Sequence, residues 1–394
     1  MLLWTGVITA KETGSFIEYW ELTGNVALEG RYFPEKPRLS AQPYLTFATA
    51  FEPELYLEWD DGTQSLTLAP FFRFDSHDNQ RTHFDIRELM WQWVGDAIEL
   101  RAGVGKVFWG VTEGVHLVDI INQTDLVESP DGEDKLGQPM VNLDFVEDWG
   151  TLSLFLLPRT RLRTFPGPSG RLSTQPRVAT DQVRFDSGAG RGHVDVAGRW
   201  SHVFGEFDVA LSHFYGNTRE PRFLPGRDAL GQAVLIPLYE RIHQTGLELQ
   251  WTHDAWLWKL EAIRRAGQGD TFRALAAGFE YTFFGLAQTA LDLGVVVEGY
   301  YDDRGETGTV IFQKDVLTAL RLTLNDEQDT VVLAGVISDL DNGARFYSAE
   351  ASRRLGDAWK LSLEARAWFD VPADDPLFSI RRDDYVQLRL AWFF

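Results

Sequence analysis

The sequence predicts an all-β fold, a transmembrane antiparallel up-and-down β-barrel of about 18 strands, with 16 as the alternative, long outer loops and short periplasmic turns. Three observations support this fold class. Apolar and polar residues alternate almost everywhere from residue 23 onward. Short and long connections follow one another in order along the chain. No run of 18 or more apolar residues exists, so a membrane-spanning helix is not predicted.

The alternation defines strands rather than helices. Near the C-terminus, Leu388, Leu390 and Trp392 share one face, and the residues between them are charged or small. Most such segments have about 9–11 residues, which suits a tilted strand crossing a bilayer. The predicted strands are 23–33, 54–60, 65–74, 83–93, 98–107, 140–147, 150–158, 193–203, 206–215, 241–252, 256–266, 273–283, 289–301, 314–325, 329–339, 345–354, 358–369 and 384–394.

The connections predict which end of the barrel is which. Short ones such as 61–64 and 148–149 contain turn residues, and longer ones such as 108–139 and 159–192 lie between them. Outer-membrane barrels have this pattern, with short turns in the periplasm and long loops outside. We therefore expect one barrel over 23–394, with 1–22 as an N-terminal segment that is a signal remnant or a periplasmic extension.

Composition narrows the class of protein. The chain has 394 residues, a formal net charge of −21, no Cys, and 44% hydrophobic residues, so it is neither disordered nor disulfide-linked. An acidic chain does not suit a nucleic-acid partner. Aromatic residues such as Trp93, Trp256 and Tyr281 gather near predicted strand ends, as in the aromatic girdles of membrane barrels. A soluble barrel with core aromatics is the alternative, but so many strands enclose too wide an interior to fill.

Charged residues on the polar faces predict an aqueous lumen, because burial in hydrocarbon would cost several kcal/mol each. Cross-strand ion pairs are the alternative role for each residue, and the mixed signs leave the preferred ion charge open. The pore-lining or constriction residues predicted from strands are Arg73, Glu99, Arg101, Arg199, Arg321, Glu350, Arg354, Glu364 and Arg366. Those predicted from the following connection are Lys106, Trp109, Asp119, Asn122 and Asp125.

The connection 108–139 is too apolar at Val115–Ile121 for a solvated loop. We expect it to fold into the lumen and set the constriction. The alternative is a cap packed on other outer loops.

The same region carries a resemblance. The motif Arg101-Ala-Gly-Val-Gly-Lys-Val-Phe-Trp-Gly110, followed by Val118-Asp-Ile-Ile-Asn-Gln-Thr-Asp125, resembles a pattern of Gram-negative outer-membrane porin-like proteins, in the style of alginate-export and phosphate-selective porins. Asn122 fits that pattern, whereas Asp119 replaces an Asn and Gln123 replaces a common Pro. Phe394 resembles the terminal assembly signal of such barrels. The resemblance implies a Gram-negative outer-membrane location and recognition of Phe394 by the barrel-assembly machinery.

No catalytic motif is found. The eight His residues lack H-E-x-x-H spacing, and no G-x-S-x-G elbow or P-loop occurs. We predict no enzymatic activity, no cofactor and no metal site; Asp131, Glu133 and Asp134 form only a weak candidate for Ca²⁺.

These observations predict a porin-like channel for passive diffusion of small polar or charged solutes, constricted by 108–139 and lumenal charges. The alternatives are an outer-membrane barrel hydrolase and a plugged structural or adhesion barrel. The expected partners are outer-membrane lipid, lipopolysaccharide and small polar solutes, but not nucleic acid, and a homo-oligomer is left open.

Overall fold

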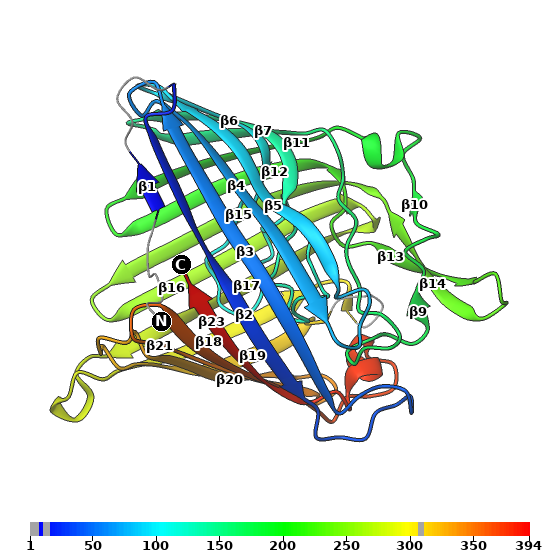
Figure 1. Ribbon diagram of the computed structural model, residues 1–394. Helices are drawn as coiled ribbons and strands as arrows, with labels where there is room; N and C mark the ends of the chain where they lie inside the picture. The colour runs from blue at the N-terminus through cyan, green and yellow to red at the C-terminus, as the bar shows by residue number, and fades with distance from the viewer. Residues whose placement is uncertain (1–7, 11–15, 306–310) are drawn as a thin grey trace.

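A computed structural model describes residues 8–10, 16–305 and 311–394, and it confirms the predicted fold class (Figure 1). Eighteen antiparallel strands form one closed barrel. They are β2 (Tyr19–Tyr32), β3 (Leu45–Trp59), β4 (Gln64–Asp75), β5 (His83–Val94), β6 (Ile98–Gly105), β7 (Gln138–Glu147), β8 (Gly150–Leu157), β11 (Asp195–Phe204), β12 (Phe207–Asn217), β15 (Arg241–His253), β16 (Trp256–Gly267), β17 (Gly269–Phe283), β18 (Asp292–Asp302), β19 (Lys314–Thr323), β20 (Val331–Asp339), β21 (Arg345–Leu355), β22 (Trp359–Phe369) and β23 (Tyr385–Phe393).

The barrel closes where β23 pairs with β2, from Asn25↔Phe393 to Tyr32↔Val386. Beyond the end of this pairing, the short strand β1 (Ile8–Ala10) pairs with β2 on the same side. Closure gives each of the eighteen strands two neighbours, so the barrel has no unpaired strand edge.

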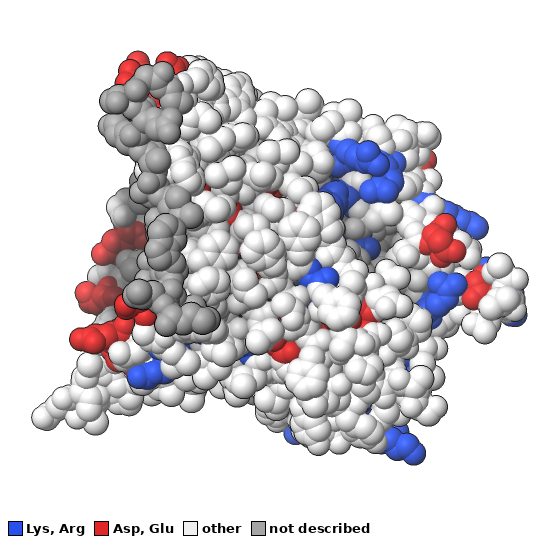
Figure 2. Space-filling view, in the orientation of Figure 1, with Lys and Arg blue, Asp and Glu red and all other residues white. Residues whose placement is uncertain are grey.

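The alternation places apolar side chains outside and polar side chains inside. On β2, Leu28 is 59% exposed, whereas its neighbours Ala27 and Glu29 are 1% and 5% exposed. Figure 2 shows the result for one face of the molecule: a largely uncharged wall, with most visible charges toward its two ends. No helix among the described residues is long and apolar enough to span a membrane.

β3 is longer than the predicted strand 54–60, because it begins at Leu45. Its pairing with β4 is interrupted between Phe51↔Phe72 and Leu55↔Leu68. Pro53 lies in this interruption, and the β4–β5 register shifts next to Pro70. Because proline cannot donate to a ladder, it marks a strand end in sequence, yet here the strand continues past the break.

The outer connections contain structure that the alternation did not predict. β9 (Arg177–Val178), β10 (Arg184–Phe185), β13 (Arg222–Arg227) and β14 (Ala233–Tyr239) form a small separate sheet, which projects from the long-loop end in Figure 1. Among the described residues, the 3₁₀ turns are η1 (Gly190–Gly192), η2 (Leu286–Gln288) and η4 (Pro376–Ile380). The predicted long connection 267–272 is instead Gln268 alone, between Gly267 and Gly269, which both adopt positive φ.

Candidate functional site

Residues 106–137, here called the insert, connect β6 to β7 and lie against the inner wall of the barrel. Trp109, Val118 and Ile121 are at most 3% exposed and pack with inward-facing side chains of β8, β12 and β15. The ring of Trp109 meets Phe155 of β8 edge-on, with centroids 5.7 Å apart. The apolar run that a solvated loop could not tolerate is therefore buried against the wall.

Two wall carboxylates bind the backbone of the insert. Glu261 on β16 accepts hydrogen bonds from the N–H groups of Val111 (2.7 Å), Thr112 (3.0 Å) and Val118 (3.2 Å). Glu298 on β18 accepts a hydrogen bond of 2.7 Å from the N–H group of Glu113, the residue after Thr112. Because a carboxylate accepts several such bonds, these two residues supply partners to insert amides that no strand pairs.

Glu113 of the insert forms ion pairs with two basic residues of the wall. Its Oε2 lies 2.7 Å from Arg321 on β19 and 3.4 Å from Lys259 on β16. Arg321 also contacts Glu280 on β17 at 3.1 Å. This part of the insert is thus held in an ion-pair network.

His116 lies between two carboxylates inside the barrel. Its Nε2 is 3.2 Å from Glu133 of the insert, and its Nδ1 is 3.9 Å from Glu261. Burial lowers the pKa of His116, but hydrogen bonding and attraction to both carboxylates outweigh it and raise the pKa to about 10. His116 is therefore an imidazolium at neutral pH.

The part of the insert around Asp125 and Glu128 is anchored to β4 and β5. Asp125 contacts Arg87 at 2.6 Å, and Glu128 contacts Arg73 at 2.6 Å. His83 Nε2 lies 3.8 Å from Asp125 and 3.6 Å from Glu128, the one described His/Asp/Glu group close enough to share an ion. Arg73 and Arg87 supply counter-charges to the two carboxylates, whereas His83 Nε2 and Glu128 Oε1 are buried without a hydrogen-bond partner among the residues that the structure describes.

Arg366 on β22 attaches the insert to a third part of the wall. Its guanidinium lies 2.8 Å from Asp131 of the insert and 2.5 Å from Glu350 on β21. Glu364, which lies on β22 with Arg366, is 3.7 Å from the same guanidinium. Of the weak Ca²⁺ candidates, Asp131 thus faces Arg366 and Glu133 faces His116. Desolvation by the surrounding residues and repulsion from nearby carboxylates raise the pKa of Asp134 to about 7.

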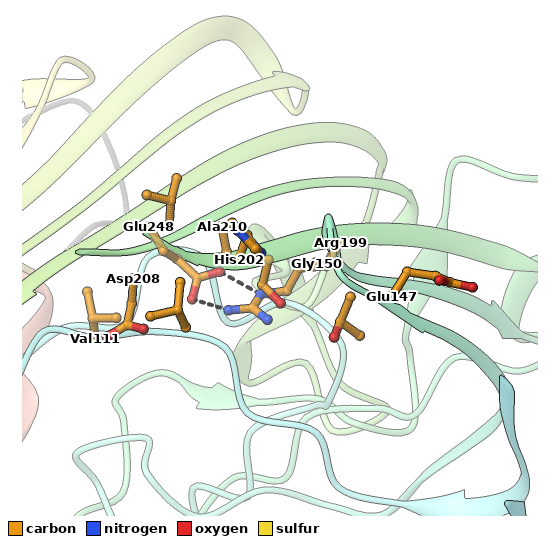
Figure 3. Close-up of a pocket in the computed structure, with 12 residues that line it drawn as sticks. Val111, Glu147, Gly150, Arg199, His202, Asp208, Ala210 and Glu248 are labelled. Atoms are coloured by element: carbon orange, nitrogen blue, oxygen red, sulfur yellow. Dashed lines mark hydrogen bonds and ion pairs between the residues drawn. The ribbon is translucent and has the colours of Figure 1, made fainter. Parts of the chain in front are cut away.

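A cavity of about 400 Å³ lies between the insert and the wall formed by β8, β11, β12 and β15. Figure 3 shows Val111 of the insert on one side and the paired Arg199 and Glu248 on the other. Both nitrogen–oxygen bonds of this pair are 2.9 Å long. Asp208 and Glu147 also line the cavity, so carboxylates exceed cations on its wall.

A second segment, residues 158–176, lies along the long-loop end of the barrel, and the sequence did not single it out. Arg161 contacts Asp85 at 2.7 Å, and the Gly167 N–H donates to Asp78 at 2.9 Å. Arg171, with a side chain only 1% exposed, contacts Asp383 just before β23 at 2.6 Å. No local pattern marks this segment, because its partners are distant in sequence.

The structure separates the predicted site residues into buried and exposed groups. Trp109, Asn122 and Asp125 are buried and hold the insert in place; Asn122, for example, donates to the carbonyls of Gly105 and Leu136. Arg354 lies near a short turn and contacts Asp329 at 3.1 Å, away from the insert. The remaining positions are as follows: Lys106 is exposed, Glu99 is half-buried, Arg101 pairs with Asp144, and Asp119 pairs with Lys135.

The fold is similar to those of solved porins. A BenF-like porin from Pseudomonas fluorescens Pf-5 has a TM-score of 0.56 and 11% identity, over 95% of this chain and 97% of that chain. Pseudomonas aeruginosa OccK5 (OpdH) has a TM-score of 0.55 and 10% identity, over 97% and 99%. P. aeruginosa OpdO has a TM-score of 0.53 and 14% identity, over 95% and 96%. No protein-family model and no curated protein sequence matches this chain.

Proposed function

We propose that this protein is a porin-like channel for passive diffusion of small polar or charged solutes across the outer membrane of a Gram-negative bacterium. The observation that carries this proposal is a closed barrel with an apolar exterior, a charged interior, and an insert folded against its inner wall beside a polar cavity. Similarity to porins at low identity supports the barrel architecture.

The insert is the proposed constriction, because ion pairs between carboxylates and arginines fix it to the wall at three places. The cavity beside it, with the Arg199–Glu248 pair, is the proposed path for solutes. The resemblance in style to alginate-export and phosphate-selective porins stays a prediction. A hydrolase or a plugged structural barrel has no supporting geometry among the described residues.

Planar bilayers test the proposal. The purified protein is expected to give ohmic conductance steps, and replacing Arg199 with Trp should lower the step size because the larger ring occupies the cavity. Arg345→Gln is the matched control, since this arginine is exposed on the outer face of the barrel. A folded protein without conductance steps at any voltage would overturn the channel and favour the plugged barrel.

We further infer recognition of the C-terminal strand by the barrel-assembly machinery. Phe394 pairs through its backbone with Gly24, and its ring stacks on Phe51 at 6.3 Å. Its place beside the seam between β2 and β23 supports this inference. Oligomeric state is a separate question, tested by light scattering in detergent.

A further inference from the structure

Two arginines stand side by side on the outer face of the barrel. Arg264 on β16 is directly opposite Arg273 on β17 in the ladder, and both side chains are exposed. They face outward, because the adjacent residues Ile263 and Ala274 face inward with exposures of 6% and 3%. Like charges directly opposite each other in a sheet destabilise it.

The position of the pair makes its charge more costly. On β16 the preceding outward residues are Trp258, Leu260 and Ala262, so Arg264 lies at the border of the apolar outer face. On β17 the next outward-facing residue after Arg273 is Leu275, which is 40% exposed. Gln268 alone joins the two strands at the long-loop end of the barrel. Arg264 and Arg273 are both within a few residues of it in the sequence, so the pair lies close to this end.

Neither guanidinium has a carboxylate partner within the described part of the chain. Asp303 is nearby, but its Oδ1 accepts the backbone N–H of Arg273 at 2.9 Å. Other outward basic residues at the same end do have partners: Lys314 lies 2.7 Å from Asp341, and Arg345 lies 3.8 Å from Asp370. The pair therefore differs from its neighbours in lacking a neutralising anion among residues 8–10, 16–305 and 311–394.

We propose that Arg264 and Arg273 together bind a phosphate group of a phosphorylated glycolipid in the outer leaflet. Two guanidinium groups offer forked donors that match phosphate oxygens, and their mutual repulsion becomes attraction when a dianion lies between them. The acyl chains of the same lipid would cover the apolar strand faces below the pair. The leaflet assignment rests on the proposed outer-membrane location, in which the long-loop end faces outward.

Native mass spectrometry of the detergent-solubilised full chain tests this proposal. The probes are diphosphorylated lipid A and the same lipid after enzymatic removal of its phosphates. We expect the unmodified protein to bind the phosphorylated form about tenfold more tightly or better, because two charge-assisted contacts are lost with the phosphate. Arg264→Gln combined with Arg273→Gln should abolish this preference, and Arg345→Gln should retain it.

The outcomes are separable from those of the channel test. Equal binding of both lipids by the unmodified protein, or a preference that survives the double substitution, overturns the lipid site. If the unmodified protein forms a dimer, and the double substitution disrupts that dimer without changing lipid binding, the lipid site is also overturned, because the pair would then serve contact between copies. The double variant should keep its heat-modifiable mobility on gels and its conductance, since both side chains lie outside the lumen. Absence of conductance in the unmodified protein would instead overturn only the proposed function.

Discussion

At the scale of single residues, buried wall carboxylates determine how the insert is held. Glu261 is fully buried and accepts three backbone hydrogen bonds from the insert, together with one from the Thr112 hydroxyl at 2.7 Å. Alternation in the sequence placed Arg321 on the lumenal face, because side-chain direction follows strand geometry. It could not predict the partner, since Glu113 is 208 residues away and only the folded insert brings it close.

Replacing Glu261 with Gln should loosen the insert. The neutral amide keeps one acceptor oxygen but loses charge assistance, and its NH₂ group faces the backbone donors, so we expect a local loss of about 2 kcal/mol. Hydrogen exchange at the amides of Val111, Thr112 and Val118 should accelerate accordingly. Glu99→Gln, a half-buried lumenal change on β6, is the control. Unchanged exchange in the Glu261 variant would show that apolar packing alone holds the insert.

The pH dependence of the insert follows from His116 and Asp134. The folded pKa of His116, about 10, exceeds its usual 6.5, so its stabilisation is complete below pH 6.5 and disappears as the pH rises through 10. The pKa of Asp134 is about 7 against the usual 3.8, so its ionisation destabilises the folded insert as the pH rises from about 4 to 7. Both effects predict a looser insert at alkaline pH.

Hydrogen exchange, corrected for its intrinsic pH dependence, measures this effect. Protection of the insert should fall by well over tenfold between pH 7 and 10, equivalent to more than about 1.4 kcal/mol. His116→Gln should remove most of that fall, whereas His77→Gln, an exposed change in another loop, should not. A pH profile that is the same in all three proteins would exclude His116 as its source.

At the scale of elements, strands were predictable and long connections were not. The period of two identified the lipid-facing and lumenal sides of β22 and β23 because each crossing strand repeats the same geometry. Pro53 marks a strand boundary in the sequence, so the first half of β3 was not predicted. The course of residues 158–176 depends on tertiary contacts. The separate sheet of β9, β10, β13 and β14 was missed because its strands are short and partly parallel.

The Arg171–Asp383 pair should hold the segment 158–176 along the mouth of the barrel. Asp383→Asn leaves a buried guanidinium without its counter-charge, so we expect a local destabilisation of about 3–5 kcal/mol. Proteinase K should then cut this segment much faster while the barrel stays intact. Arg177→Gln, which changes a half-buried residue just beyond the segment, provides the comparison. Equal cleavage rates in the two variants would argue that other contacts fix the segment.

At the scale of the whole molecule, the distribution of charge is more informative than the net charge of −21. The lumenal face of β3 carries Glu52, Glu54 and Glu58 in its half nearest the short turns, where Glu52 is paired with Arg389. The cavity beside the insert also has more carboxylates than cations. Acidic residues also occur in the connections, for example Asp131 and Asp134, but the lumen has an acidic wall of its own.

This acidic wall predicts a preference for cations. In a tenfold gradient of potassium chloride, the reversal potential should have the sign of a cation-selective pore. Replacing Glu52, Glu54 and Glu58 together with Gln should lower the cation-to-anion permeability ratio by roughly threefold, or about 0.7 kcal/mol, because these charges are solvated and screened. Asp61→Asn in the adjacent turn is the control. A ratio that is unaffected by the triple change would locate selectivity elsewhere.

The seam between β2 and β23 has a consequence for the order of folding. Arg31 and Gln387, which share a hydrogen bond across it, are 356 residues apart, so the ring cannot be completed until almost the entire chain is synthesised. Until then, both β2 and the most recently added strand are open edges able to pair with another molecule. Contacts this remote in sequence also form slowly. The two open strand edges of an incomplete sheet therefore need temporary protection from other molecules. Pairing of β2 with β23 then closes the barrel around its polar interior.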